Sequence, residues 1–330
     1  MAKKIGQEPQ WRMSSKIYCP IGGLMKNCFL FPGQGAQYPG MAKDFYEASK
    51  AVRDLFKEAS EAASMDLKRL IFEGDEETLR QTRNTQISMV VAEAASALMA
   101  REQGITPAGA AGFSVGEWPA LAEAKVITNY DMFRLVSERG RLMEEAGNRA
   151  GGTAMSAVLY LSPEKIEQVI HEAGLKQCWI ANYNSPVQCV ISGTETDIAI
   201  AEEKLRQAGA KRVIRLKVSG AFHSPLMQDA YDPFKELVEA TQFSDPKINL
   251  YSNVTGKKML SGEEAKKNAS LQIISPVRWI DEEKNIAADC YDYCFETGPG
   301  TVLAGLWKAS GSTIPCIAAG TLQALAAFSL

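Results

Sequence analysis

The stretch that most constrains the fold of this chain is AAGFSVGE at positions 110–117, a small apolar run that ends in Gly-x-Ser-x-Gly. A short apolar run is typical of a buried strand, and the next residues, WPALAEA, are typical of a helix. A strand that turns sharply into a helix holds a serine at its apex, the arrangement called a nucleophile elbow. Gly112 and Gly116 lack the Cβ atoms that would collide there. The pattern predicts Ser114 as a nucleophile at a helix N-terminus, with an ordinary glycine-rich turn as the alternative.

Length and composition limit the classes of protein that this chain can be. Its 330 residues suffice for one large domain that carries a smaller one, and 46% hydrophobic with 23% charged residues is typical of a globular protein. A net charge of -3 gives no basic footprint for nucleic acid. No apolar run approaches the roughly 18 residues that a membrane span needs. We therefore expect neither nucleic acid nor membrane among the partners, and we expect residues 1–26 to be a loose N-terminal extension.

The cysteines argue against a metal site. The pair Cys290-x-x-x-Cys294 has no second half, and the whole chain holds only two histidines. An odd number of scattered cysteines favours a reducing compartment, so the sequence predicts a cytoplasmic protein without a metal. The seven are Cys19, Cys28, Cys178, Cys189, Cys290, Cys294 and Cys316.

The order of the predicted elements indicates an α/β protein with an insertion. A strand at 28–31 is followed by a helical region from 41 to 98, in which the polar residues at 84–87 favour a helix cap. Glycines at 147–152 predict a loose connection. The pattern strand-helix-strand-strand-helix-strand over 151–220 is that of a ferredoxin-like unit. This leaves the two segments 27–150 and 221–330 for the large subdomain.

One arginine lies where an apolar residue is expected. A helix begins near Thr128, with Asp131 as its capping partner, and Arg139 falls on the apolar stripe of that helix. A charge that faces the core costs several kcal/mol unless an anion pairs with it. Arg139 is therefore part of an internal ion pair, the receptor of an anionic ligand, or a side chain that reaches the surface. The stripe consists of Met132, Leu135, Val136, Leu142 and Met143.

Only one histidine has a setting that suggests catalysis. His171 lies in a charged helix and is expected to be solvated, whereas His223 stands between a strand end and a proline-containing turn. A serine nucleophile needs a base that is neutral near pH 7, and no other histidine is available. The sequence therefore pairs Ser114 with His223.

Seven blocks occur along the chain in this order: FPGQGAQ (31–37), GFSVGE (112–117), RG (139–140), NYNSP (182–186), FHS (222–224), SPVRW (275–279) and ETGPG (296–300). In sequence and order they resemble the malonyl-CoA:acyl carrier protein transacylases of fatty acid synthesis, close relatives of polyketide synthase acyltransferase domains. The resemblance runs from about residue 28 to the C-terminus. It implies an α/β-hydrolase-like large subdomain interrupted by the ferredoxin-like one.

The resemblance implies a role for each matching residue. Ser114 is the nucleophile and His223 its general base, which the backbone carbonyl of Gln272 orients in place of an aspartate. Backbone N–H groups of Gln34 and Val115 form the oxyanion hole.

The same resemblance implies an acidic acyl substrate. Arg139 matches the arginine that binds the malonyl carboxylate, and Gln86 matches a glutamine of the same pocket, although a cap remains its alternative. Phe222 resembles the bulky ring of malonyl-selective forms, and Asn182 is carried over as a substrate-binding residue. The implied reaction is ping-pong: Ser114 takes malonyl from malonyl-CoA, and the phosphopantetheine thiol of acyl carrier protein takes it from the serine. No permanently bound cofactor is expected, and we expect a monomer.

Two observations keep other functions open. The family usually has histidine before the nucleophile, where this chain has Phe113, so an inactive homologue that binds a carrier protein remains an alternative. A serine esterase is a further alternative, but its base normally lies near the C-terminus, and 107 residues follow His223. A trans-acting polyketide-type acyltransferase is the third. Four basic residues precede His223, and two interpretations stay open for them: a contact surface for the carrier protein or the nucleotide of coenzyme A, or a solvated strand face. They are Lys211, Arg212, Arg215 and Lys217.

Overall fold

The protein contains a parallel sheet of five strands, which carries the elbow. A computed structural model describes residues 25–328, so nearly all of the expected extension 1–26 lies outside the described residues. The strand order is β7-β2-β1-β8-β9, with every neighbouring pair parallel. Its strands are β1 (Asn27–Phe31), β2 (Pro107–Gly112), β7 (Asn249–Leu250), β8 (Tyr293–Glu296) and β9 (Cys316–Ala318). Parallel strands buried on both faces account for the continuous apolar run of β1.

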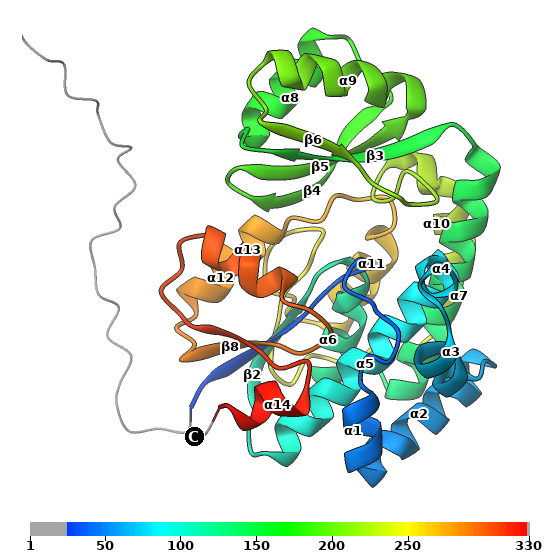
Figure 1. The fold of residues 1–330 in the computed structure, drawn as a ribbon, viewed down its shortest axis with the longest axis vertical. Coiled ribbons are helices and arrows are strands. Elements are labelled where there is room, and N and C mark those ends of the chain that lie inside the picture. The colour runs from blue at the N-terminus through cyan, green and yellow to red at the C-terminus, as the bar shows by residue number, and fades with distance from the viewer. Residues whose placement is uncertain (1–24, 329–330) are drawn as a thin grey trace, which may run out of the picture.

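A second sheet, antiparallel and of four strands, forms a separate layer at the top of Figure 1, covered by α8 (Pro163–Glu172) and α9 (Glu195–Gln207). Its order is β4-β5-β3-β6. That order is the ferredoxin-like arrangement, so the predicted fold class is confirmed; the subdomain boundaries stay a prediction. The strands are β3 (Thr153–Leu159), β4 (Cys178–Ser185), β5 (Gln188–Thr194) and β6 (Arg212–Arg215).

Helices surround the parallel sheet, and α5 is buried on nearly all sides, which explains its weak amphipathic pattern. It lies beside α7 in Figure 1, and the largest hydrophobic cluster includes residues of both. The remaining helices are α1 (Lys43–Ala48), α2 (Lys50–Ala63), α3 (Leu67–Glu73), α4 (Glu76–Arg80), α6 (Glu117–Glu123), α10 (Gln228–Glu239), α11 (Gly262–Leu271), α12 (Trp279–Ala288), α13 (Val302–Ala309) and α14 (Leu322–Ala326). α5 spans Thr82–Glu102 and α7 spans Asn129–Ala150.

The predicted loose connection at 147–152 is wrong for residues 147–150, because α7 continues to Ala150. A Cβ atom on Gly147 would lie 2.4 Å from the Ser219 carbonyl oxygen. Gly147 therefore permits a close approach between the helix and the segment that leads to His223, and it does not make a turn. Only Gly151 and Gly152 adopt positive φ angles there.

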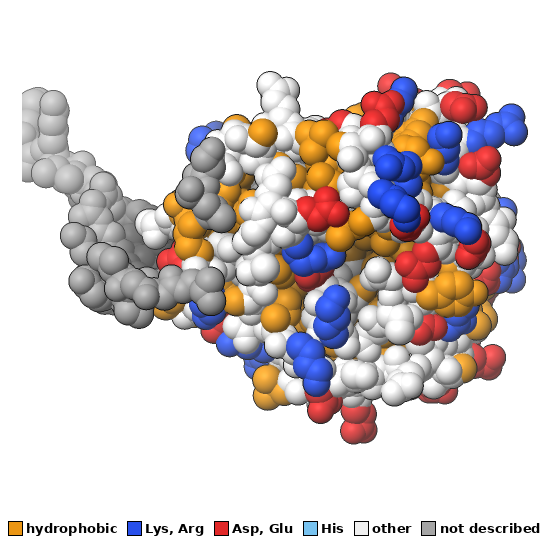
Figure 2. Space-filling model, turned by 90° about the horizontal axis from the view of Figure 1, so that it is seen from below, with side chains coloured by type: hydrophobic (Ala, Val, Ile, Leu, Met, Phe, Trp, Pro, Cys, Tyr) orange, Lys and Arg blue, Asp and Glu red, His pale blue; other side chains and the backbone are white. Residues whose placement is uncertain are grey.

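The surface shows no continuous patch of one charge on the face drawn in Figure 2, where acidic and basic side chains are interspersed. In the basic run, Arg215 forms ion pairs with Glu195 and Glu202, which favours the solvated strand face for that residue. Among residues 25–328, no helix has the length and apolar character to cross a membrane.

Candidate active site

The elbow has the geometry that its glycines predict. Ser114 follows β2 with φ of +53°, begins a short 3-10 helix, and leads into α6. A Cβ atom on Gly112 would lie 1.9 Å from the Gly116 carbonyl oxygen, and one on Gly116 would lie 2.2 Å from that of Phe31. Only glycine fits at either position, so strand, turn and helix hold the serine in a strained conformation that is typical of functional sites.

Ser114 and His223 meet although 109 positions separate them. Ser114 Oγ lies 2.7 Å from His223 Nε2, while His223 Nδ1 lies 2.9 Å from the Gln272 carbonyl oxygen and 3.2 Å from that of Ser275. Carbonyl oxygens only accept hydrogen bonds, so Nδ1 carries the proton and Nε2 accepts from the serine hydroxyl. Burial, together with the positive charge of Arg139, lowers the pKa of His223 to about 4. The imidazole is therefore neutral at pH 7.

The segments that hold Gln34 and Val115 lie side by side. Strands β1 and β2 are parallel neighbours, with Phe31 opposite Gly112, so the residues after each strand emerge at the same edge. A Cβ atom on Gly33 would lie 2.8 Å from the Phe113 carbonyl oxygen, which puts the loop after β1 directly against the elbow. This arrangement offers backbone N–H groups from two loops beside one serine.

Arg139 is fully buried and has no ion pair with a carboxylate of the described residues. Nη1 donates to Gln86 Oε1 at 2.7 Å, Nη2 donates to Gln272 Oε1 at 2.8 Å, and Nε has no hydrogen-bond partner within residues 25–328. Burial lowers the pKa of Arg139 to about 9, and the Glu117 carboxylate opposes this shift, so the guanidinium is charged at pH 7. Its full burial excludes a side chain that reaches the surface.

Gln86 is not a cap residue. The helix begins at Thr82 with Gln81 at its N-cap, which makes no side-chain capping bond, and Gln86 lies in the second turn. Its side chain is buried and accepts from Arg139, so the cap interpretation of this residue is wrong.

The predicted substrate-binding residues Phe222 and Asn182 lie in different surroundings from each other. Phe222 is buried in the main hydrophobic cluster beside His223. Asn182 lies in β4, where its backbone bridges to Val277. Its side chain makes no hydrogen bond to the other predicted site residues that the structure describes, so the structure links it to the His223-orienting loop only through the backbone.

Phe113 packs behind the elbow. Its half-buried ring meets the Trp279 ring edge to face with centroids 5.7 Å apart, and Trp279 Nε1 donates to Glu283 Oε1 at 2.8 Å. The Phe113 ring, which stands where the family usually has histidine, is therefore held by an aromatic contact with Trp279.

Sequence reasoning missed Asn253. Its Oδ1 accepts from the Ser114 N–H at 2.7 Å, and its Nδ2 donates to the Gly112 carbonyl at 2.6 Å and to Glu282 Oε1 at 2.8 Å. One buried amide thus holds the elbow on both sides of Phe113. A single asparagine in a turn has no sequence pattern that marks it as a site residue, and Asn253 lies far from the elbow in the sequence, so nothing local linked the two.

The side chain of Gln272 was also missed, since only its carbonyl was predicted. Its Nε2 donates to the Ser114 carbonyl at 3.0 Å and to the Glu117 carboxylate. Burial raises the pKa of Glu117 to about 7, against the bonds from Gln272 and Asn253 and the charge of Arg139. The site thus combines a serine–histidine pair, backbone donors and a buried cation, Arg139, which interacts with the Glu117 carboxylate through space but forms an ion pair with none of the described carboxylates.

A serine at a strand-to-helix elbow with a histidine in hydrogen-bond reach is the arrangement of enzymes that carry an acyl group on the serine. A family model described as acyl transferase domain matches residues 28–322, and the chain belongs to this family.

Individual relatives are similar over most of their length. The chain is 40% identical over 299 residues to a malonyl CoA-acyl carrier protein transacylase of Bacillus subtilis, which covers 89% of this chain and 93% of that protein. The structure of a malonyl CoA-acyl carrier protein transacylase from Coxiella burnetii has a TM-score of 0.88 at 31% identity, covering 92% of this chain and 96% of the other. A malonyl-transacylase solved in complex with a type II polyketide synthase acyl carrier protein has a TM-score of 0.87 at 35% identity, covering 91% and 98%.

Proposed function

We propose that this protein is an acyl-carrier-protein S-malonyltransferase that moves malonyl from malonyl-CoA to the phosphopantetheine thiol of acyl carrier protein in fatty acid biosynthesis. One observation carries the proposal. Ser114 Oγ lies 2.7 Å from His223 Nε2, and the side-chain amide of Gln272 links the Ser114 carbonyl to the buried Arg139, whose hydrogen-bond partners among the described residues are both amides. An acyl group that ends in a carboxylate supplies the anion that this arginine lacks.

The first half-reaction acylates Ser114. His223 Nε2 takes the hydroxyl proton while Ser114 Oγ attacks the thioester carbonyl, and the N–H groups of Gln34 and Val115 stabilise the oxyanion. The carbon–sulfur bond then breaks, and coenzyme A leaves as a thiol with the proton from His223. The product is a malonyl ester on Ser114 with a neutral His223.

The second half-reaction reverses these roles. His223 Nε2 takes the proton of the phosphopantetheine thiol, and the sulfur attacks the ester carbonyl through the same oxyanion hole. The carbon–oxygen bond breaks, and Ser114 Oγ recovers its proton from His223. No metal or permanently bound cofactor takes part in this scheme.

The carboxylate site also acts on the base. The positive charge of Arg139 contributes to the low pKa of His223. When a malonyl carboxylate binds Arg139, this charge is neutralised and the pKa of His223 rises, which strengthens the base. Malonyl thus favours its own transfer, whereas an acetyl group leaves the base weak. Crowding by Phe222 against a branched acyl group contributes only about 1 to 3 kcal/mol.

Intact mass spectrometry after mixing with malonyl-CoA tests the proposal. We expect a malonyl adduct on the wild type that disappears in Ser114→Ala and His223→Ala, because one loses the nucleophile and the other its base. His171→Ala is the matched control, since His171 is exposed on α8 and retains the adduct. An unmodified wild type, or an adduct on Ser114→Ala, contradicts the proposed function.

The rate of adduct formation gives a second measure of the base. Because His223 of the free enzyme stays neutral down to about pH 4, we expect kcat/KM for acylation by malonyl-CoA to change little between neutral pH and about pH 5 and to fall below that. The maximal rate should begin to fall at a higher pH, because the bound carboxylate raises the pKa of His223.

A polyketide carrier protein is the second candidate acceptor. The observation in its favour is the similarity to the malonyl-transacylase solved with a type II polyketide synthase acyl carrier protein. Parallel transfer assays with a fatty-acid and a polyketide carrier protein distinguish the two. The monomeric state and the cytoplasmic location stay predictions.

A further inference from the structure

The side chain of Gln272 has contacts that its backbone role does not explain. Gln272 is the C-cap residue of α11, and its main-chain carbonyl accepts from His223 Nδ1. The amide group at the end of its side chain is a separate feature, buried, and engaged at both its oxygen and its nitrogen.

The two ends of this amide join different parts of the site. Oε1 accepts from Arg139 Nη2 at 2.8 Å, while Nε2 donates to the Ser114 carbonyl oxygen at 3.0 Å and to the Glu117 carboxylate. Because an amide is planar, fixing its oxygen on a guanidinium also fixes the direction in which its N–H groups point. The position of Arg139 is thereby transmitted to the backbone of the elbow.

The Ser114 carbonyl belongs to the peptide group that carries the Val115 N–H. In a trans peptide the two groups point in opposite directions within one plane. A donor that holds the carbonyl therefore sets the direction of the N–H on the other side, and it also polarises that N–H. Asn253 holds the preceding peptide group through the Ser114 N–H, so two side-chain amides fix consecutive planes of the elbow.

We propose that Gln272 is a positioning residue that couples Arg139 to the Val115 N–H, so that the group which holds the acyl carboxylate also aligns an oxyanion donor. The inference rests on the proposed function of the site. Gln86 is the instructive contrast, because it contacts Arg139 but makes no hydrogen bond to the elbow among the described residues.

Gln272→Met removes both amide contacts and keeps the backbone carbonyl for His223. The test measures the maximal rate of Ser114 acylation in single-turnover experiments with malonyl-CoA and with acetyl-CoA. An oxyanion donor serves every acyl group, so we expect both maximal rates to fall by roughly 10- to 100-fold, part of the 10²- to 10³-fold that loss of a donor costs. A residue that only held Arg139 would lower the malonyl rate and leave the acetyl rate unchanged, which overturns the coupling.

A swapped pair separates catalysis from folding. In Gln272→Glu combined with Glu117→Gln, the amide introduced at position 117 donates to the carboxylate introduced at position 272, which restores the bond between the two side chains without changing the net charge. Neither oxygen of that carboxylate donates to the Ser114 carbonyl. We expect wild-type melting temperature with maximal rates that stay low for both acyl groups, and recovery of the rates overturns the proposal.

Asn268→Leu is the matched control. Asn268 is a buried amide one turn earlier on α11, and its Nδ2 makes no hydrogen bond in the part of the chain that the structure describes. We expect wild-type rates for this variant. If the wild type itself is not acylated, the proposed function fails; if the wild type is acylated and Gln272→Met acylates normally, only the coupling fails.

Discussion

Arginines near the two ends of the contact between helices α5 and α7 have opposite kinds of hydrogen-bond partner. At the buried end, Arg139 has two neutral amides as partners and no ion pair with a described carboxylate. Two residues along the same helix, Arg141 donates to Glu138 at 2.7 Å and to Glu145 at 2.9 Å, with its side chain 40% exposed.

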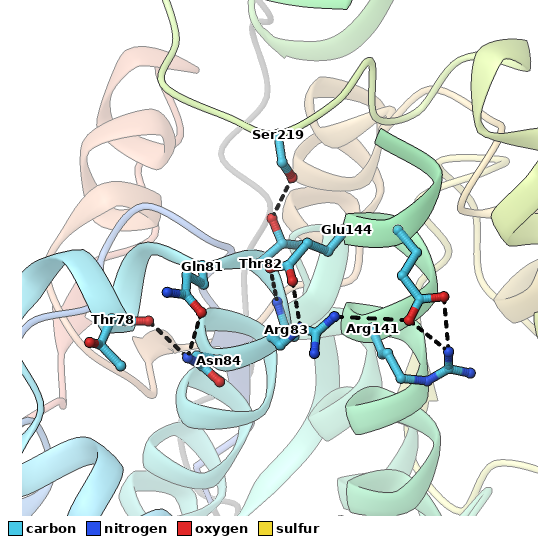
Figure 3. A network of polar contacts seen from close by, with 9 residues as sticks. Thr78, Gln81, Thr82, Arg83, Asn84, Arg141, Glu144 and Ser219 are labelled. Atoms are coloured by element: carbon cyan, nitrogen blue, oxygen red, sulfur yellow. Dashed lines mark hydrogen bonds and ion pairs between the residues drawn. The ribbon is translucent and has the colours of Figure 1, made fainter. Parts of the chain in front are cut away.

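The exposed contact between α5 and α7 also pairs an arginine with a carboxylate. Figure 3 shows Arg83 of α5 reaching Glu144 of α7, with Nε donating at 2.5 Å and the backbone N–H at 3.2 Å. Next to it, the hydroxyls of Thr82 and Ser219 lie 2.9 Å apart. Where water competes, arginine is paired with carboxylate; where a cation is buried with amides alone, its charge is available for a ligand.

The largest effect should come from replacing the two arginines on α7 one at a time. Arg139→Met removes the receptor for the acyl carboxylate, so we expect malonyl transfer to lose roughly 10³-fold in kcat/KM while acetyl transfer gains relative to it. Because a buried charge without a carboxylate costs stability, we also expect a melting temperature no lower than that of the wild type.

Arg141→Met is the matched control, with transfer kinetics like the wild type. Unchanged malonyl kinetics in Arg139→Met, or an equal loss in both variants, would remove the distinction between the two arginines.

A smaller effect should follow from giving Arg139 the partner that it lacks. Gln86→Glu places a carboxylate at the oxygen that already accepts from Nη1, and this internal anion competes with the ligand. We expect the KM for malonyl-CoA to rise by roughly 10- to 100-fold, equivalent to about 1.4 to 2.7 kcal/mol of lost binding. Gln86→Met, which removes the amide without adding charge, should raise KM less, and the opposite order contradicts the idea that the cation is reserved for a ligand.

The sequence predicted the charged ends of this site better than the groups between them. Helical periodicity placed Arg139 on the apolar stripe, because it fixes which face a residue occupies, but it left open whether the side chain is buried or reaches the surface. Ser114 and His223 could be paired because the chain offers few histidines and a distinctive elbow. Gln34 and Val115 came from the resemblance, and parallel pairing of β1 with β2 brings their loops together.

The amides Asn253 and the side chain of Gln272 could not be predicted in the same way. Each reaches Ser114 across more than a hundred positions of sequence, and no local pattern encodes such a contact. The loose connection predicted from the glycines at 147–152 was wrong for a related reason. Gly147 is required by a tertiary contact with the Ser219 backbone, and the local rule that glycine makes turns does not apply there.

The smallest effect should come from the exposed contact of Figure 3. Glu144→Gln keeps an oxygen for the Arg83 backbone N–H and removes the ion pair with its side chain, which is 43% exposed. Exposed pairs contribute less than about 1 kcal/mol, so we expect a loss of unfolding free energy within that limit in urea titration, and a smaller loss at high salt. Arg83 lies three residues before Gln86 on α5, so the ion pair is connected to the buried end through one turn of helix. A changed KM for malonyl-CoA in Glu144→Gln would show that the exposed pair helps to place Gln86, and the two ends of the interface would then act as one site; an unchanged KM with a small loss of stability keeps them separate.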